Sequence, residues 1–438
     1  MDTMSDLPFG DGEYRRRQEE FLSNMPTDSL VIIPNNQVSI RSNDTSYPYR
    51  ANSYVLYLCG WSEPDSILTA KFNDGLWQTT LFVRPRDTKA EIWEGRRVGP
   101  EGALQDWPID NSLPIDDAEE YISENIESGL KPSAIIGIDS KIDDIISGSK
   151  MSDIPDPRTL LDVMRTVKSE AEIGVMKEAS KIASDAHVKA MRATHPGIGE
   201  WQIQSVIEGH FIDSRSQWSY KSIVGGGDNA TILHYGSNSD SIEDGDLVLV
   251  DAGCEVHGYA SDITRTWPVN GKFTEPQREI YDLVLEAEEA AIKACKVGST
   301  WNSSHKAASL VLAKGLIDLG ILDCTLSEAL GENLDGPFRN YFMHGTSHLL
   351  GLDVHDVGGG RKGDGKPGPT LESGMVLTVE PGLYFASWRD DVQIPERYSG
   401  IGIRIEDDVL VTEDGPVVLT AGCPKSIDEI ESLISKGD

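Results

Sequence analysis

The chain has 438 residues, and 72 acidic side chains against 39 basic ones give it a formal net charge of −33. A surface this acidic repels the phosphates of nucleic acids and of anionic lipids, so we expect neither nucleic acid nor a membrane among its partners. The hydrophobic content of 39% is that of a globular protein, and the length is sufficient for two domains.

The cysteines indicate a reducing compartment. They stand singly, without a CxxC pair, as Cys59, Cys254, Cys295, Cys324 and Cys423. The first residues lack the apolar segment of a signal peptide, and no run approaches the roughly 18 apolar residues of a membrane span. We therefore expect a cytoplasmic protein.

The first third of the chain alternates helix and strand patterns. A helix is predicted over 11–26, where apolar residues share one face, and buried strands over Ser29–Pro34, 76–84 and 134–138. Helical or irregular sequence around 116–126 separates the last two strands. This alternation predicts a small α/β domain.

Capping boxes mark two long helices after a linker at 152–157. Ser169 with Glu172 opens a helix that ends at 195–197, and Thr274 with Gln277 opens one that runs to about Gly298. A third helix is expected over 303–319. Strand patterns between these helices predict an antiparallel sheet with helices packed on one side.

Residues 247–268, LVLVDAGCEVHGYASDITRTWP, are typical of two strands joined by a tight turn at 255–258. With the turn centred between Val256 and His257, Asp251 lies directly opposite Asp262. Directly opposed side chains have Cβ atoms roughly 4.5–5.5 Å apart, and like charges there destabilise a hairpin. The pair therefore predicts a bound cation, most naturally a site for two metal ions. Alternatively, one aspartate is only a turn or capping residue.

Two later strand patterns each carry a glutamate. In 400–411, GIGIRIEDDVLV, the isoleucines occupy one face with a period of two, which leaves Arg404 and Glu406 on the other. In 375–382, MVLTVEPG, Thr378 and Glu380 share a face. The simpler interpretation of each glutamate is a solvated face of an antiparallel sheet.

Four of the nine histidines favour a functional site. His234 stands in ILHYG, and His344, His348 and His355 stand in MHGTSHLLGLDVHDVGG. Three histidines so close together, among glycines and beside an aspartate, are unusual for core packing. We therefore expect this group to bind metal or substrate.

Charge arithmetic favours a dinuclear metal site. Two divalent ions would balance the four carboxylates, and a neutral His348 would add one nitrogen ligand. A ligand set dominated by oxygen suits Mn²⁺ best, with Co²⁺ or Fe²⁺ as alternatives, and suits a thiolate-preferring zinc site less well. Two ions about 3.5–4 Å apart can activate a water and stabilise a tetrahedral intermediate, which predicts a hydrolase.

These residues lie in sequence motifs that resemble those of a known family. The series DAG…D…HGTSH…E…E resembles the pita-bread metallopeptidases. The phrases ILHY, DGDLVLVDAGCE, MHGTSHLLGLDVHDVGG, GMVLTVEPGLY and GIGIRIEDDV resemble aminopeptidase P, the Xaa-Pro aminopeptidase, and YRRRQEEF, DTSYPYRANS and EIWEGRR resemble its N-terminal domain. The resemblance implies an α+β protein, with a smaller α/β domain at 1–168 and a catalytic pita-bread domain at 169–438.

The resemblance also implies a reaction and a ligand set. The reaction is release of the N-terminal residue from peptides with proline in second position, by metal-dependent hydrolysis. Asp251 would bind one ion, Asp262 and Glu406 would bridge both ions, and His348 and Glu380 would bind the other.

Further residues receive roles by the same resemblance. Glu380 would carry the proton to the proline nitrogen, and His344 and His355 would orient the substrate and stabilise the oxyanion. His234 would line the pocket. Arg404 would pair with carboxylates beside the metal ligands and shape the proline side.

The N-terminal domain of this family helps to restrict the active site, often through subunit packing. A homo-oligomer, dimer or tetramer, is therefore expected, with Asp44 and Trp93 reaching a neighbouring subunit's site. The alternative is a surface aspartate and a core tryptophan. The basic, glycine-rich segment 361–369 does not match the sequence motifs of the family closely.

Two other functions stay open. Prolidase, which cleaves Xaa-Pro dipeptides and in some cases phosphotriesters, shares the five ligands and the histidines. A non-catalytic pita-bread binding module is the alternative from another class, but such modules have typically lost metal ligands, and all five positions here carry ligating residues.

Overall fold

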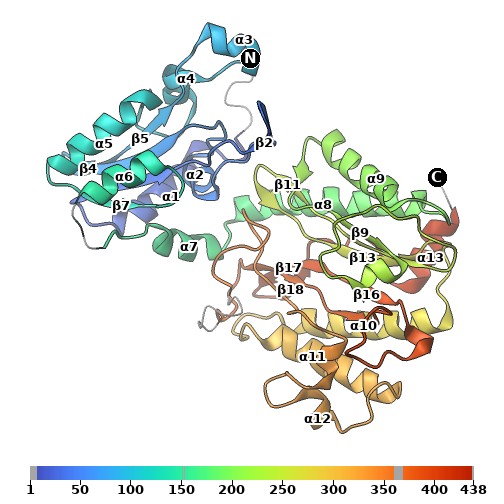
Figure 1. Ribbon diagram of the computed structural model, residues 1–438. Coiled ribbons are helices and arrows are strands. Elements are labelled where there is room, and N and C mark those ends of the chain that lie inside the picture. Colours follow the sequence, from blue (N-terminus) through green and yellow to red (C-terminus); the bar gives the residue numbers. More distant parts are fainter. Residues whose placement is uncertain (1–6, 150, 152, 360–367, 437–438) are drawn as a thin grey trace. The chain divides into compact units, whose positions relative to one another are not determined.

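The computed structural model describes residues 7–149, 151, 153–359 and 368–436. The chain forms two compact units, Met1–Met164 and Arg165–Asp438, and Figure 1 shows their elements. Each unit is considered by itself. Within the described residues, no helix combines the length and the apolar character that a membrane span requires.

The first unit is built on a mixed sheet of order β6-β5-β4-β1-β7. The strands are β1 (Ser29–Pro34), β4 (Ile67–Asn73), β5 (Leu76–Val83), β6 (Asn111–Pro114) and β7 (Lys131–Ala134). Both end strands pair in parallel with their neighbours, and the central pairs are antiparallel. The strand expected over 134–138 was therefore placed too late, because pairing with β1 ends at Ala134.

Helices cover both faces of this sheet. Leu30 and Ile32 of β1 pack in a core cluster with residues of α5 (Ala118–Glu127) and α6 (Ser140–Gly148). The alternate residues of β1 adjoin α1 (Asp11–Ser23) and α2 (Ser53–Cys59). Burial on both faces explains why SLVIIP is continuously apolar.

The second unit consists of short antiparallel strands with long helices packed against them. The strand orders are β13-β10-β9, β12-β11-β8, β14-β17-β18 and β15-β16. These strands include β8 (Gln217–Trp218), β9 (Ile223–Gly226), β10 (Leu247–Asp251), β13 (Thr264–Pro268) and β18 (Gly415–Val418). The long helices are α8 (Glu170–Ala193), α9 (Glu200–Asp213), α10 (Glu275–Ala294) and α11 (Ser303–Asp318), and α12 (Leu326–Leu330) and α13 (Ile427–Lys436) are shorter. The three long helices predicted from the sequence are confirmed, as is the capping box at Ser169. Helix α8 packs against β11 (Cys254–Val256) and β12 (Tyr259–Ala260), and the Tyr259 hydroxyl donates to Glu172 of the helix.

Both predicted glutamate strands are interrupted next to the glutamate. Sequence 375–382 forms β14 (Val376–Val379) and the start of β15 (Gly382–Tyr384), and sequence 400–411 forms β16 (Gly402–Arg404) and most of β17 (Asp407–Thr412). Glu380 and Glu406 lie in the gaps between these strands. Glu406 is 2% exposed and Arg404 is 3% exposed, so a solvated sheet face is wrong for this segment.

Candidate functional site

The hairpin that carries the two aspartates differs from the predicted register. Its turn is His257-Gly258, with φ of 50° and 85°, as a two-residue type I′ turn requires. Val256 therefore faces Tyr259, and Asp251, at the end of β10 (Leu247–Asp251), faces Thr264 of β13 (Thr264–Pro268). The predicted turn was centred one residue too early, so Asp262 is not directly opposite Asp251.

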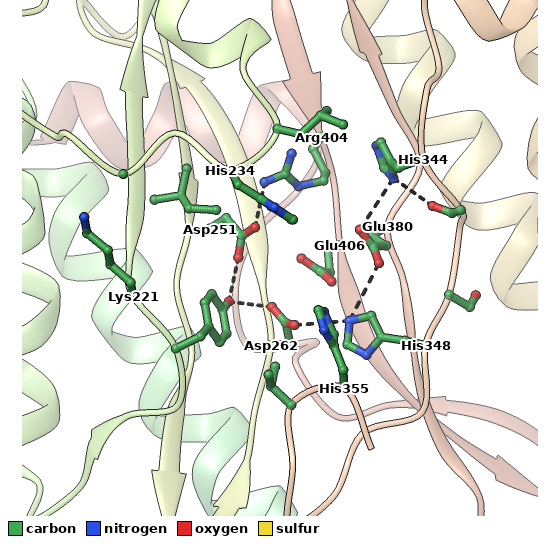
Figure 2. A pocket seen from close by; sticks show the side chains of 17 residues that line it. Lys221, His234, Asp251, Asp262, His344, His348, His355, Glu380, Arg404 and Glu406 are labelled. Atoms are coloured by element: carbon green, nitrogen blue, oxygen red, sulfur yellow. Dashed lines mark hydrogen bonds and ion pairs between the residues drawn. The ribbon is translucent and has the colours of Figure 1, made fainter. Parts of the chain in front are cut away.

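The two aspartates are nevertheless neighbours. Asp262 is two residues from Thr264 and so shares the face of the sheet to which Asp251 belongs, as a diagonal neighbour. The hydroxyl of Tyr220 lies 2.6 Å from Asp251 Oδ1 and 2.5 Å from Asp262 Oδ1 (Figure 2). Since a phenol carries one proton, the two carboxylates compete for it.

His348 and Glu380 complete the opposite wall of the site. His348 Nε2 lies 3.4 Å from Asp262 Oδ2 and 3.7 Å from Glu380 Oε1. The other ring nitrogen, Nδ1, lies 3.1 Å from the carbonyl oxygen of Leu349. A proton on Nδ1 would satisfy that carbonyl and leave Nε2 as an electron-pair donor, which is the tautomer that metal-binding histidines adopt.

A hydrogen-bonded chain fixes the remaining groups. Arg404 donates to Asp251 (2.6 Å), to the Tyr384 hydroxyl (2.9 Å) and to Thr264 Oγ1 (3.1 Å). Thr264 in turn donates to Glu406 Oε2 (2.6 Å), and the Tyr384 hydroxyl lies 2.8 Å from His344 Nε2. Arg404 thus links groups from both ends of the site.

Three groups converge closely enough to share a metal ion. Among the described residues, Asp262, His348 and Glu406 each present one ligand atom, and these atoms lie within 4.8 Å of one another. Glu380 and Asp251 flank this trio in the same pocket, whose volume is about 520 Å³. Figure 2 shows the carboxylates in the middle of the pocket, with His344, His348 and His355 on one side.

The electrostatics of the site favour the binding of a cation. Burial raises the pKa of Glu406 well above its usual range, and the charges of Asp262 and Glu380 raise it further. Burial likewise raises the pKa of Glu380 to about 7, against the opposing effect of His348. Burial lowers the pKa of His348, but its bond to Asp262 and the charge of Glu380 overcome this and raise it to about 9.

The neighbour of Glu406 in sequence provides the contrast. Asp407 contacts Arg265 (2.7 Å) and Lys425 (2.6 Å). Although burial opposes them, these cations hold the pKa of Asp407 below its usual range. Two adjacent buried acids thus differ in their counter-charges: Asp407 has two from the protein, whereas Glu406 faces other carboxylates. A divalent cation fits the second situation.

The predicted histidines and Arg404 all reach this pocket. His234, His344, His355 and Arg404 line it, and the His355 ring packs edge-on against His348 with centroids 4.5 Å apart. Burial, followed by the charge of Arg404, lowers the pKa of His344 to about 3, so this imidazole is neutral.

The sequence analysis missed Tyr220, Thr264 and Tyr384. The Tyr220 hydroxyl contacts the ligand candidates Asp251 and Asp262, and the Tyr384 hydroxyl contacts His344 and Arg404. Thr264 lies inside a strand whose pattern is uniformly buried. Alternating apolar sequence carries no signal for such contacts. The pairing of β10 with β13 could have indicated Thr264, had the turn been placed at His257-Gly258.

Asp44 and Trp93 belong to the first unit. Asp44 is exposed between the short strands β2 (Ile40–Ser42) and β3 (Thr45–Ser46). Trp93 is 88% exposed on α3 (Thr88–Glu94), so the alternative of a core tryptophan is wrong. Most of the segment 361–369 lies outside the described residues.

Comparison with known proteins identifies the family of both units. The aminopeptidase P N-terminal domain matches residues 14–132, and metallopeptidase family M24 matches residues 174–413. The Xaa-Pro aminopeptidase of Haemophilus influenzae is 40% identical over 97% of both chains. That of Escherichia coli is 40% identical over 96% of this chain and 97% of its own.

Solved structures agree over the full length. Proline aminopeptidase P II from Yersinia pestis matches with a TM-score of 0.91 at 39% identity, covering 98% of this chain and 100% of its own. Zinc-substituted Escherichia coli aminopeptidase P in complex with product matches with a TM-score of 0.92 at 39% identity, covering 98% of this chain and 99% of its own. The expected pita-bread fold behind an aminopeptidase P N-terminal domain is confirmed, and the chain belongs to the Xaa-Pro aminopeptidases of metallopeptidase family M24.

Proposed function

We propose that the pocket of this metallo-aminopeptidase binds two divalent metal ions and uses them to cleave the bond before a proline in second position. The observation that carries the two-ion count is the charge of the site: four carboxylates and one imidazole stand together, and Arg404 is engaged with one of the carboxylates. Four negative charges match two divalent ions, as two-metal hydrolases require.

The ligand assignment follows the layout of the site. Asp262, His348 and Glu406 supply the converging trio. Within it, Asp262 and Glu406 would help to hold both ions. Asp251 would complete one ion's ligands, and Glu380 those of the other. Because oxygen dominates this set, Mn²⁺ is the proposed metal, ahead of Co²⁺ and Fe²⁺.

The ions, when bound, would supply Lewis acidity to an attacking water and to the scissile carbonyl. The protein side chains do the rest. Glu380 accepts the proton of the attacking water and delivers it to the leaving proline nitrogen, and His344 and His355 hold the substrate carbonyl. His344 Nδ1 lies 2.7 Å from the Gly345 carbonyl oxygen and Nε2 is held by Tyr384. A donation from His344 to the substrate therefore requires one of these bonds to exchange.

A paired measurement tests the two-ion proposal. Protein stripped with a chelator and titrated with Mn²⁺ should bind two ions per chain, while hydrolysis of a Gly-Pro-Ala peptide returns. A matched Gly-Ala-Ala peptide should stay intact, because its second residue is not proline. Full activity with one ion per chain would overturn the two-ion assignment but leave the peptidase activity standing.

Peptide length separates this activity from prolidase. Gly-Pro-Ala should be cleaved with a higher kcat/KM than the dipeptide Gly-Pro. Turnover of the dipeptide alone would make the enzyme a prolidase.

Assembly and location are further proposals. We propose a homo-oligomer in which Asp44 and Trp93 reach the pocket of a neighbouring subunit, because an 88% exposed tryptophan is suited to a contact between chains. Light scattering should give a mass above that of one chain, and Trp93→Ala should lower it.

Free cysteines, of which all but Cys324 are buried, support the proposed cytoplasmic location.

A further inference from the structure

One lysine belongs to the pocket but has no place in the proposed chemistry. Lys221 directly follows Tyr220 and lines the pocket together with the metal-site residues. Figure 2 shows it at the pocket edge, on the side away from His344, His348 and His355. Within the described part of the chain, no hydrogen bond or ion pair to the Lys221 ammonium is found, whereas the other pocket cation, Arg404, is bonded to Asp251.

The local structure leaves room for this ammonium. A Cβ atom added to Gly236 would lie only 3.0 Å from Lys221 Nζ. A larger residue at 236 would therefore displace the lysine. Gly236 does not have a positive φ, so the glycine is not required by the backbone conformation.

The proposed reaction assigns this end of the pocket to one substrate residue. Glu380 delivers the proton to the proline nitrogen, so the proline lies toward Glu380 and the histidines. The opposite end, beside Tyr220 and Lys221, is left for the residue that precedes the scissile bond. An aminopeptidase accepts a single residue there, and its side chain therefore extends toward Lys221.

The walls at this end of the pocket suit a short substrate side chain that ends in a charged group. Ile223 and Leu233 line the pocket and pack in one apolar cluster. They offer apolar contact to side-chain methylenes, and Lys221 lines the same pocket with its ammonium. A carboxylate is the natural partner of an ammonium without an ion pair.

We propose that Lys221 is a specificity-determining residue that favours an acidic first residue, so that the preferred substrates begin with Glu-Pro or Asp-Pro. The inference rests on the proposed orientation of the substrate. Lys221 acts in binding, not in bond cleavage, so its contribution should appear in KM and leave kcat unchanged.

The test compares Glu-Pro-Ala with the near-isosteric neutral peptide Gln-Pro-Ala. The wild-type enzyme should have the higher kcat/KM for the glutamate peptide, and Lys221→Met should reduce the ratio of the two values about two- to fivefold, as an exposed ion pair would. Lys221→Glu should reverse the preference, in favour of Lys-Pro-Ala. Raising the salt concentration should shrink the wild-type ratio through screening.

Lys177→Met is the matched control. Lys177 is exposed on α8 and does not line the pocket, so this change removes the same charge from another place. It should leave the ratio unchanged. An unchanged ratio in Lys221→Met, with both peptides still cleaved, overturns the role of Lys221. If the wild-type enzyme cleaved no Xaa-Pro peptide, the proposed function itself would be wrong.

Discussion

At the scale of single residues, neighbouring buried acids differ in the counter-charges that the protein provides for them. Buried charges in proteins are paired, because an isolated ionised carboxylate is costly to bury. Asp407 follows this rule within the protein, because it contacts the two cations Arg265 and Lys425. Asp408 accepts hydrogen bonds only from neutral groups, Ser180 and the backbone of Asp262, and burial raises its pKa well above the usual range. Glu406, in the same run, receives only the Thr264 hydroxyl among the described side chains. A divalent cation would supply the counter-charge of Glu406.

This contrast predicts opposite effects of two neighbouring substitutions on the metal-free protein. Glu406→Gln removes a charge that other carboxylates repel, so it should raise the free energy of unfolding by on the order of 1 kcal/mol while abolishing metal-dependent activity. Asp407→Asn leaves Arg265 without its carboxylate and should lower the free energy of unfolding by about 3–5 kcal/mol. Urea titrations in chelator measure both. A stability loss in Glu406→Gln would mean that its carboxylate is satisfied by the protein.

At the scale of elements, the hairpin shows how much the sequence predicts. The apolar-rich sequence 247–268 correctly predicted a hairpin, but each arm is divided into two strands, β10 with β11 and β12 with β13, instead of forming one. The faces of Asp251 and Asp262 were right even though the turn was misplaced by one residue. Moving the centre of a hairpin by one residue shifts facing positions by two, which preserves the face of every side chain. The contact of Tyr220 could not be predicted, because it joins segments that only tertiary packing brings together. The pairing of Arg404 with a carboxylate was expected from the family resemblance and not from the strand pattern.

The turn itself can be tested. His257 and Gly258 both have positive φ, and only the glycine adopts this conformation without steric cost. Gly258→Ala should lower the free energy of unfolding by about 1–2 kcal/mol. His257→Asn should raise it slightly, because asparagine tolerates the left-handed region better. Thermal or urea unfolding of the metal-free variants gives both values, and the same sign for both would contradict the type I′ turn.

At the scale of the whole molecule, buried histidines make the fold sensitive to acid. His187 lies on α8 with no exposed surface, and burial lowers its pKa to about 4, against an ordinary value of 6.5. The unfolded chain therefore takes up the proton at about pH 6.5, and the folded protein only at about pH 4. Since the unfolded state binds more protons in this window, stability falls as the pH falls from 6.5 to 4.

His187→Gln removes this titration and keeps an amide that can donate to the Ala183 carbonyl, to which His187 Nδ1 is now bonded. The loss of unfolding free energy between pH 7 and pH 5 should be smaller in the variant, by on the order of 2 kcal/mol. His195→Gln, an exposed control, should show the wild-type loss. Equal losses in all three proteins would show that His187 does not set the acid response.

The net charge also affects the stability of the whole molecule, but its effect depends on the salt concentration. With a formal net charge of −33, the folded chain concentrates negative charge in a compact volume, and self-repulsion lowers its stability. Added salt screens this repulsion, with a Debye length that falls from about 30 Å at 0.01 M to about 10 Å at 0.1 M. The metal-free protein should therefore unfold at a higher urea concentration in 0.1 M than in 0.01 M NaCl.

Mn²⁺ should raise the urea concentration of unfolding further only where the metal-site carboxylates are intact. Glu406→Gln should therefore keep the response to salt and lose the response to Mn²⁺. If that variant responded to both as the wild type does, the stabilising Mn²⁺ would be bound elsewhere on the acidic surface.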